Sequence, residues 1–295
     1  MAVETITAAA AGTWMLGDRQ VNRMGFGAMR LTGTEAFHGG EPRDRDQSIA
    51  VLRRAVELGV NHIDTASFYF SRLRSANELI SRALAPYPEE LVIATKVGPG
   101  REPDGTWIDR SDPARVRGQV EENLRQLGRD HLDLVYLRLG QHESLTEPFE
   151  ILAGIREAGL IRHLGVSGVT VEQLAQAQAI APVVSVQNRY GLDLRGRDSV
   201  LQVCGRQGIA FVPFFALAGD GRHKGFTQPA NDAVVAVARA HDATPAQVQL
   251  AWTLAQGPHV LAIPGTGDPG HLEENIATAA LCLTPADLTH LETTP

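Results

Sequence analysis

The chain has 295 residues, 43% of them hydrophobic, and a formal net charge of −7. A chain of this length and composition can bury one large α/β core or two smaller ones. Because the charged residues are scattered along the chain, we expect no nucleic-acid surface, which would need a clustered basic face. We also expect no membrane partner, since no apolar stretch reaches the length of a bilayer span.

The start of the chain lacks the features of an export signal. It contains an alanine run at residues 8–11 but no basic segment and no long apolar segment, so we predict a disordered N-terminus over residues 1–12 and no signal peptide. The cysteines Cys204 and Cys282 have no CxxC spacing, which favours buried thiols over a disulfide or a metal site. These features predict a reducing, cytoplasmic location and no bound metal.

A short hairpin is predicted ahead of the main fold. Residues 13–16 and 20–23 flank the turn pair Gly17-Asp18, and we expect this hairpin to act as a lid. After it, short apolar strands alternate with amphipathic helices. Strands are expected at residues 24–29, 60–64, 91–96, 132–137, 161–166, 183–186, 209–212 and 260–263. Helices are expected at residues 48–59, 77–85, 112–127, 147–158, 171–179, 199–207, from 231, from 244, at 270–279 and from 284 to the C-terminus.

Strands that repeat about every 30 residues between helices predict a (β/α)8 TIM barrel. We expect one barrel domain over residues 13–295, with the hairpin at its start and an extra helix at its C-terminus. An open, doubly wound sheet is the alternative. The barrel is favoured because Gly25-Phe26-Gly27 lacks the third glycine and the helix start of a dinucleotide-binding fingerprint.

Charged side chains end three successive predicted strands. Asp64, Lys96 and Arg138 close strands two, three and four, and Tyr69 lies in the loop after strand two. In a barrel all four reach the same C-terminal face. One interpretation is a structural ion pair between Asp64 and Lys96 beside a packed tyrosine. The other is acid catalysis, in which the Lys96 ammonium stabilises the Tyr69 phenolate and lowers its pKa from about 10, while Asp64 holds Lys96 charged.

Several short motifs occur in the order that they have in a known family. They are Asp64-Thr65-Ala66 with Tyr69, the strand-end Lys96, Leu132-Asp133-Leu134, Gly165-Val166-Ser167, Val186-Gln187-Asn188, and Ile263-Pro264-Gly265-Thr266 with Glu274-Asn275. On these motifs the chain resembles the aldo-keto reductases from about residue 24 to residue 275. The resemblance implies that Tyr69 donates a proton, that Asp64 and Lys96 tune it, and that a nicotinamide dinucleotide binds without a Rossmann domain.

Two positions depart from the family pattern. The usual histidine at the end of strand four is replaced by Arg138, whose guanidinium can polarise a carbonyl but cannot relay a proton. A bacterial branch similar to pyridoxal reductases also carries arginine there, so the change is compatible with an active enzyme. Phe70 stands where glycine usually follows the tyrosine and is expected to narrow the mouth of the site. His142 is a candidate for the missing imidazole, although a loop histidine is usually solvated.

The resemblance also implies a set of cofactor-binding residues. Ser167 and Gln187 would contact the nicotinamide carboxamide, and Phe214 would lie flat against the ring, although without the motif it would be assigned to the core. The glycine-rich turn after strand eight suits a phosphate, because exposed amides at a helix N-terminus favour anions. The complete set is Gly27, Ala28, Met29, Asp64, Ser167, Gln187, Phe214, Phe215, Ala216, Leu217, Gly219, Gly265, Thr266, Gly267, His271, Glu274 and Asn275.

The remaining ionisable residues are assigned simpler roles. Family members selective for NADPH often carry Lys and Arg where this chain has Gly265 and His271, so we expect NADPH to be preferred less steeply, with NADH possible. Lys224 could reach a phosphate, but a solvated loop charge is the favoured interpretation. His62 is expected to be a core residue and Asp133 a structural partner.

Two functions are consistent with these features. The first is an NADPH-dependent oxidoreductase that reduces an aldehyde or ketone to an alcohol, with pyridoxal or another aromatic aldehyde as the expected substrate. The second is a regulatory subunit that binds the nucleotide and turns over slowly or not at all. Arg138 keeps the second hypothesis open, and the intact Asp64, Tyr69 and Lys96 weigh against it. We expect a monomer or a small homo-oligomer.

Overall fold

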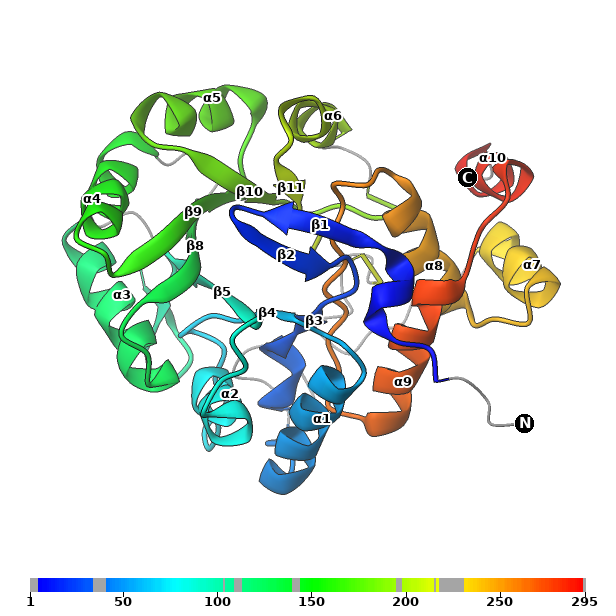
Figure 1. The fold of residues 1–295 in the computed structure, drawn as a ribbon, viewed down its shortest axis with the longest axis horizontal. Helices are drawn as coiled ribbons and strands as arrows, with labels where there is room; N and C mark the ends of the chain where they lie inside the picture. The colour runs from blue at the N-terminus through cyan, green and yellow to red at the C-terminus, as the bar shows by residue number, and fades with distance from the viewer. Residues whose placement is uncertain are drawn as a thin grey trace.

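A parallel sheet curls around the centre of the molecule (Figure 1). The computed structural model describes residues 5–33, 41–102, 104–108, 113–139, 144–194, 198–214, 216–217 and 231–293. Seven strands of this sheet pair in the order β11-β10-β9-β8-β5-β4-β3. They are β3 (Phe26–Gly27), β4 (His62–Asp64), β5 (Val92–Val97), β8 (Leu132–Arg138), β9 (Ile161–Ser167), β10 (Val183–Gln187) and β11 (Ala210–Phe211). All of these pairings are parallel.

Residues 259–264 close the sheet into a barrel. The N–H of Leu261 donates a hydrogen bond to the carbonyl of Phe211 at 2.9 Å. On the other side, the N–H of Ala262 donates to the carbonyl of Arg23 at 2.9 Å. The eighth strand expected at residues 260–263 is therefore reduced to isolated bridges, yet it joins β11 to the segment before β3. The fold is a (β/α)8 barrel, and the open doubly wound alternative is wrong.

Helices cover the outside of the barrel (Figure 1). They are α1 (Arg45–Glu57), α2 (Ala76–Leu84), α3 (Pro113–Leu127), α4 (Thr146–Glu157), α5 (Val171–Ile180), α6 (Asp198–Gln207), α7 (Asp232–Ala240), α8 (Pro245–Ala255), α9 (Pro269–Ala277) and α10 (Pro285–Thr293). The Thr244-Pro245 signal holds, because the Thr244 side chain caps α8 by accepting the N–H of Gln247. The extra C-terminal helix is α10, which is joined to the end of α7 by a 2.9 Å contact between His241 and Asp287.

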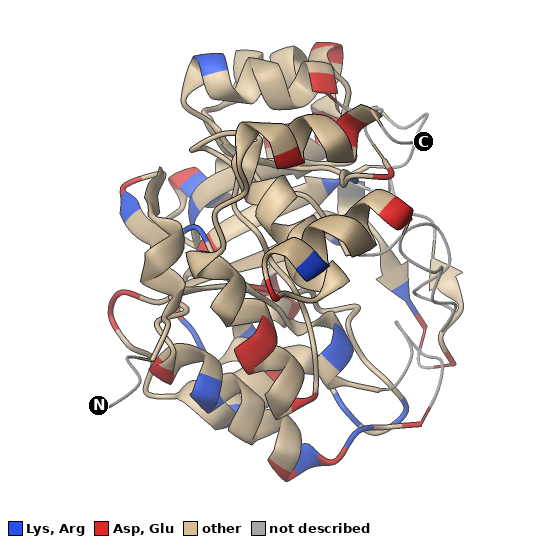
Figure 2. Cartoon of the chain, turned by 90° about the vertical axis from the view of Figure 1, so that its right-hand side faces the viewer, with Lys and Arg blue, Asp and Glu red and all other residues tan. Residues whose placement is uncertain are grey.

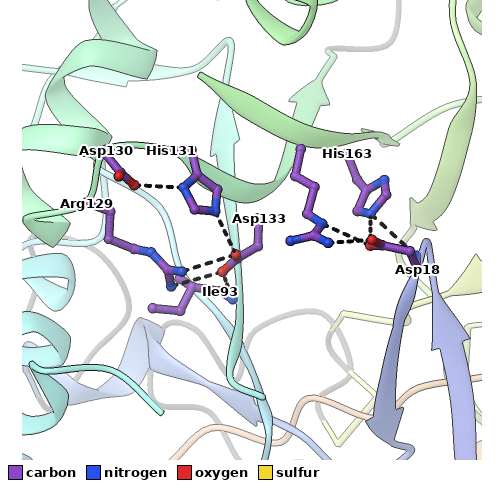
Figure 3. A network of polar contacts seen from close by, with 8 residues as sticks. Asp18, Ile93, Arg129, Asp130, His131, Asp133 and His163 are labelled. Carbon is purple, nitrogen blue, oxygen red and sulfur yellow. Dashed lines mark hydrogen bonds and ion pairs between the residues drawn. The ribbon is translucent and has the colours of Figure 1, made fainter. Parts of the chain in front are cut away.

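The predicted hairpin is present as β1 (Thr13–Leu16) and β2 (Arg19–Asn22). Its buried side chains pack against the barrel interior. Its turn is tied to the start of β9, because the Asp18 carboxylate accepts a hydrogen bond from Arg162 Nε at 2.9 Å and lies 2.7 Å from His163 Nε2 (Figure 3). The hairpin therefore closes the end of the barrel at which the strands begin, opposite the end that carries the candidate site.

A second polar cluster holds the start of β8. Asp133 is buried and lies 3.0 Å from Arg129 Nη1, one turn earlier in the chain (Figure 3). Asp133 also lies 3.9 Å from His131 Nε2, and its Oδ2 accepts the N–H of Ile93 on β5 at 2.9 Å. Asp133 is therefore the structural partner that the sequence predicts, and it fixes the register of two neighbouring strands.

The N-terminal segment differs from the prediction. Residues Ala8–Ala11 form a short 3₁₀ helix, and the buried Ala8 donates its N–H to the carbonyl of Leu58 at 2.8 Å. Residues 8–11 thus differ from the expectation of disorder over residues 1–12, because Ala8 is buried and its N–H is bonded at the end of α1. Residues 1–4 lie outside the described residues.

Charges of both signs are dispersed over the molecule. On the side shown in Figure 2, basic and acidic positions are interspersed. None of the helices in the described ranges combines the length and the apolar character that crossing a membrane requires.

His62 lies in the core, as expected. It is the first residue of β4, is 3% exposed, and packs its ring on the backbone of Gly25, where no side chain would fit. Neither ring nitrogen has a hydrogen-bonding partner among the residues described. Burial lowers the pKa of His62 from 6.5 to about 4.

This buried imidazole is expected to make the protein sensitive to acid. Between about pH 6.5 and pH 4 the unfolded chain binds a proton at His62 that the native state does not bind. The free energy of unfolding is therefore highest above about pH 6.5 and falls as the pH decreases. By about pH 4.5 the loss from this residue reaches roughly 2–3 kcal/mol, which urea unfolding at a series of pH values measures.

The variant His62→Gln removes this titration, so its free energy of unfolding should fall less steeply over the same pH range. The matched control is His290→Gln, because His290 lies on an exposed face of α10. It should keep the slope of the parent protein. An unchanged slope in His62→Gln would show that other groups cause the acid sensitivity.

Candidate active site

The inner surface of the barrel changes from apolar to charged along the neighbouring strands β5 and β8. Residues two apart on a strand share a face. The inward positions are Val92, Ala94 and Lys96 on β5 and Leu134, Tyr136 and Arg138 on β8. The apolar members belong to the barrel core, and the charged members stand last. The alternation of the strands therefore delivers these charges to one end, where the loops that follow the strands begin.

Lys96 and Asp64 form a buried ion pair at this end. Lys96 is 1% exposed and Asp64 is 4% exposed. The Lys96 ammonium donates hydrogen bonds to both carboxylate oxygens at 2.7 Å and to the carbonyl of Thr65 at 2.9 Å. Gln187 Nε2 donates to Asp64 Oδ1 at 2.7 Å. Buried charges must be paired and hydrogen-bonded in this way. Removing one partner of such a pair typically lowers the free energy of unfolding by about 3–5 kcal/mol.

Tyr69 lies beside this pair, in the loop between β4 and α2. The Lys96 ammonium is 4.8 Å from the centre of the Tyr69 ring. We expected Lys96 to lower the pKa of Tyr69, but burial raises this pKa above 10 and outweighs the opposing charge of Lys96. Lys96 acts in the expected direction, but the net shift is upward, because the sequence does not show how completely the ring is enclosed. The raised pKa keeps the phenol protonated at neutral pH.

Arg138 faces the same space. Its Nη1 donates a hydrogen bond to Ser167 Oγ at 3.3 Å, and its guanidinium lies 4.8 Å from the centre of the Phe214 ring. The charge of Arg138 also opposes the rise in the pKa of Tyr69. The structure thus places the arginine next to two residues that the resemblance assigns to the nicotinamide ring.

A carboxamide fits the residues at the floor of this space. Gln187 is buried and uses its amide nitrogen on Asp64, while its Oε1 has no hydrogen-bonding partner among the described residues. The Ser167 hydroxyl is buried close to it, at the end of the neighbouring strand. An unused buried acceptor beside a hydroxyl group can bind the amide of a nicotinamide, which offers both a donor and an acceptor.

The glycines near strand eight bring backbones together. A Cβ atom on Gly27 would lie 2.7 Å from the carbonyl oxygen of Ile263, and one on Gly265 would meet the carbonyl oxygen of Gly27. Thr266 uses its hydroxyl to accept the N–H of Asp268 at 3.0 Å, and Asp268 caps α9. The predicted phosphate turn is therefore held tightly in place.

A cation beside this turn was not identified from the sequence. The Arg43 side chain lies directly over Gly267, in space that any side chain there would occupy. Its Nε donates to the carbonyl of Arg30 at 2.9 Å. His271, which was singled out from the sequence, has a side chain that is 71% exposed and a ring nitrogen 4.0 Å from Asp268. The sequence does not indicate that Arg43 reaches this turn, because Arg43 precedes α1 and is far from Gly267 in the chain.

The other assigned cofactor residues have mixed placements. Ala28 is buried and Met29 is half-buried in a 3₁₀ helix that follows β3. Asn275 is buried and Glu274 half-buried on α9. Ala216 and Leu217 are half-buried, near Gly191 and the core, respectively. Phe215, Gly219, Lys224 and His142 lie outside the described residues.

A buried polar network supports the ion pair from behind. The Thr65 hydroxyl donates to Asn77 Oδ1 at 2.7 Å, and Asn77 Nδ2 donates to Asn123 Oδ1 at 2.9 Å. Thr95 Oγ1 donates to the same Asn123 oxygen at 2.6 Å. These bonds join α2 and α3 to the ends of β4 and β5, so they fix the Thr65 carbonyl that holds Lys96.

The fold agrees with a comparison against protein families. The model of the Aldo/keto reductase family matches residues 23–294, and the chain belongs to this family. The matched segment of the chain begins just after the hairpin and includes α10.

Individual relatives extend this result. Pyridoxine 4-dehydrogenase of Escherichia coli (strain K12) is 42% identical over 289 residues, which cover 96% of this chain and 98% of the relative. Probable aldo-keto reductase 1 of Glycine max is 31% identical over 297 residues, covering 91% of this chain and 84% of the relative. Among solved structures, an aldo-keto reductase from Klebsiella pneumoniae in complex with NADPH has a TM-score of 0.78 and 27% identity, covering 95% of this chain and 93% of that chain.

Proposed function

We propose that this protein is an NADPH-dependent oxidoreductase that reduces an aldehyde or ketone carbonyl to an alcohol, with pyridoxal or another aromatic aldehyde as its substrate. The observation that carries the proposal is Tyr69 beside the buried Lys96 and Asp64 pair. The family membership supports the reaction type. The relative called pyridoxine 4-dehydrogenase, at 42% identity, supports a substrate of the pyridoxal class.

The residues at the end of the barrel have separate roles in the reaction. The bound dinucleotide supplies the hydride. The phenol of Tyr69 donates a proton to the carbonyl oxygen, and the Lys96 ammonium stabilises the phenolate that remains. Asp64 keeps Lys96 charged and oriented through two hydrogen bonds. Arg138 offers a fixed positive donor to the oxygen that becomes negative during the transfer.

The proposed cofactor site extends from the barrel floor to α9. Gln187 and Ser167 would bind the carboxamide, and Phe214 would lie against the ring. The turn at Gly265 and the N-terminus of α9 accept phosphate groups. Glu274 and Asn275 lie one helical turn further along α9, at a distance suited to the adenine.

A direct assay tests this function. The protein is incubated with NADPH or NADH and a panel of aldehydes that includes pyridoxal, and cofactor oxidation is followed by absorbance. We expect oxidation of NADPH with aromatic aldehydes and slower oxidation of NADH. A protein that binds NADPH tightly but oxidises it with no aldehyde would instead be the nucleotide-binding regulatory subunit.

Three further features of the protein are proposed. A single domain over residues 13–295 is supported by the family match to residues 23–294. A reducing, cytoplasmic location is supported by the two free cysteines, Cys204 and Cys282. A monomer or a small homo-oligomer is the proposed state, and light scattering measures it.

Arg43 is expected to set the preference for NADPH. Its guanidinium lies at the proposed phosphate turn, and a hydrogen bond to a charged group contributes about 1.5–3 kcal/mol. Arg43→Gln should therefore lower the ratio of NADPH to NADH affinity by roughly tenfold or more. The matched control is Arg45→Gln, because Arg45 is two residues away, half-exposed and paired with Asp46.

A phosphate contact made by His271 would give the cofactor preference a pH dependence. If its imidazolium supplied the charge, the ratio of NADPH to NADH affinity would rise on acidification, as the imidazole gains a proton. A ratio that stays constant between about pH 6 and pH 8 in the parent protein, and that falls in Arg43→Gln, assigns the phosphate contact to Arg43. If Arg43→Gln keeps the parent's ratio of NADPH to NADH affinity, the assignment to Arg43 is contradicted.

A further inference from the structure

The loop that follows Lys96 returns to the loop that carries Tyr69. Directly after β5, strands β6 (Gly100–Arg101) and β7 (Trp107–Ile108) form a small antiparallel hairpin. Arg101 pairs with Trp107 in this hairpin and is only 9% exposed, which is unusual for an arginine. A buried guanidinium has five N–H donors that must be satisfied, so its partners show which part of the structure it holds.

One partner lies in the same hairpin, since Arg101 Nε donates to the carbonyl of Gly105 at 3.3 Å, and two others are the carbonyls of the residues before and after Tyr69. Arg101 Nη1 donates to the carbonyl of Phe68 at 3.2 Å and to the carbonyl of Phe70 at 3.2 Å. The carbonyl of Tyr69 itself accepts the N–H of Ala76, the first residue of α2, at 2.9 Å. Three consecutive carbonyls are therefore fixed, two of them by one guanidinium.

Aromatic contacts fix the same segment from its side chains. The Arg101 guanidinium lies 4.6 Å from the centre of the Phe70 ring and 5.5 Å from that of Trp107. The Phe68 ring meets the Tyr69 ring edge to face at 5.2 Å, and it meets Trp107 at 5.9 Å. Phe70, the residue that departs from the family pattern, thus supplies the aromatic face on which the guanidinium rests.

We propose that Arg101 is a positioning residue that fixes the orientation of Tyr69 by binding the carbonyls of Phe68 and Phe70. The proposal rests on the proposed function, in which Tyr69 donates the proton. Arg101 acts through geometry: it holds the backbone on both sides of the donor, whereas Lys96 and Arg138 act on the phenol through their charges. Proton transfer requires the donor oxygen at hydrogen-bonding distance from the carbonyl oxygen, and a displacement of about 1 Å can cost about 100-fold in rate.

Single-turnover measurements test the proposal, because they report the chemical step rather than product release. The variants Arg101→Gln and Arg101→Lys are mixed with excess aldehyde after NADPH has bound, and cofactor oxidation is followed. We expect Arg101→Gln to slow this step roughly 10- to 100-fold while NADPH affinity stays within about twofold. Arg101→Lys keeps the charge without the planar fork and should recover only part of the loss. The control is Arg72→Gln, an exposed arginine of the same loop, which should react like the parent.

A double-mutant cycle with Tyr69→Phe separates positioning from general support of the fold. If Arg101 acts through Tyr69, the effect of Arg101→Gln should largely disappear when Tyr69 is already phenylalanine. If instead the two losses multiply, or if NADPH affinity falls in proportion to the rate in both Arg101 variants, Arg101 supports the fold and the proposal is overturned. A Tyr69→Phe protein that reacts like the parent would contradict the proposed function itself. A slow Tyr69→Phe with a fast Arg101→Gln contradicts only the role of Arg101.

Discussion

Replacing Tyr69 by phenylalanine is expected to slow carbonyl reduction by roughly 10²–10⁴-fold and to leave NADPH affinity almost unchanged. The phenylalanine ring keeps the contacts with Phe68 and with the Lys96 ammonium but has no proton to give. Lys96 and Asp64 remain paired, so the buried charges stay satisfied. Turnover with pyridoxal and NADPH measures the loss, and a fluorescence titration with NADPH measures the affinity.

The pH dependence of the parent gives a second test of Tyr69. Because burial raises the pKa of Tyr69 above 10, the donor is protonated throughout the neutral range. Reduction should therefore be constant across that range and fall only as the pH rises through the Tyr69 pKa. Alcohol oxidation needs the phenolate and should increase over the same interval. If Tyr69→Phe retains the turnover of the parent, another acid serves as the donor, and His142 is the first residue to replace.

Replacing Arg138 by alanine is expected to reduce turnover by roughly 10²–10³-fold. The guanidinium is a charge-assisted donor held near Ser167 and Phe214, and losing a donor aimed at a developing oxyanion typically costs about 2.7–4 kcal/mol. In the proposed site the phosphate and adenine ends of the cofactor would lie elsewhere, so NADPH affinity should change little. Arg138→His should restore part of the loss, because imidazole also donates a hydrogen bond.

The outcomes for Arg138 also separate the two functional hypotheses. If Arg138→Ala reduces the whole aldehyde panel as fast as the parent, Arg138 is not involved and Tyr69 alone holds the carbonyl. If the parent binds NADPH without oxidising it, and Arg138→His begins to reduce aldehydes, the protein is the regulatory subunit. In that case arginine at this position is what suppresses the reaction.

Most of the barrel could be predicted because each strand and helix carries its own local pattern. The alternation of short apolar strands with amphipathic helices predicted the seven paired strands, and the strand-end positions of Asp64 and Lys96 predicted that they would meet. The eighth strand was predicted in full but is reduced to isolated bridges at residues 260–263. Local apolar character shows that a segment is buried, not how many ladder hydrogen bonds its neighbours allow.

What could not be predicted depends on distant contacts and on burial. Arg101 reaches the carbonyl of Phe68 from 33 residues away, and Arg43 reaches Gly267 from the far end of the chain. No local pattern marks such pairs. The net upward shift in the pKa of Tyr69 was not predicted, because the charge of Lys96 is visible in the sequence, whereas the enclosure of the ring is a property of the packed loops. The 3₁₀ helix at Ala8–Ala11 was missed because an alanine run carries no apolar period.

The hairpin formed by β1 and β2 lies at the end of the barrel opposite the candidate site. It seals the end where the strands begin, through Asp18 and its contacts with β9, a full strand length away from Tyr69 and Lys96. Substitutions at the sealed end can therefore change thermal tolerance without reshaping the reaction chamber, as is typical of barrels whose chemistry is confined to one face. A more stable form of this protein can therefore be sought by redesigning the hairpin and its contacts with β9, while the loops at the candidate site stay unchanged.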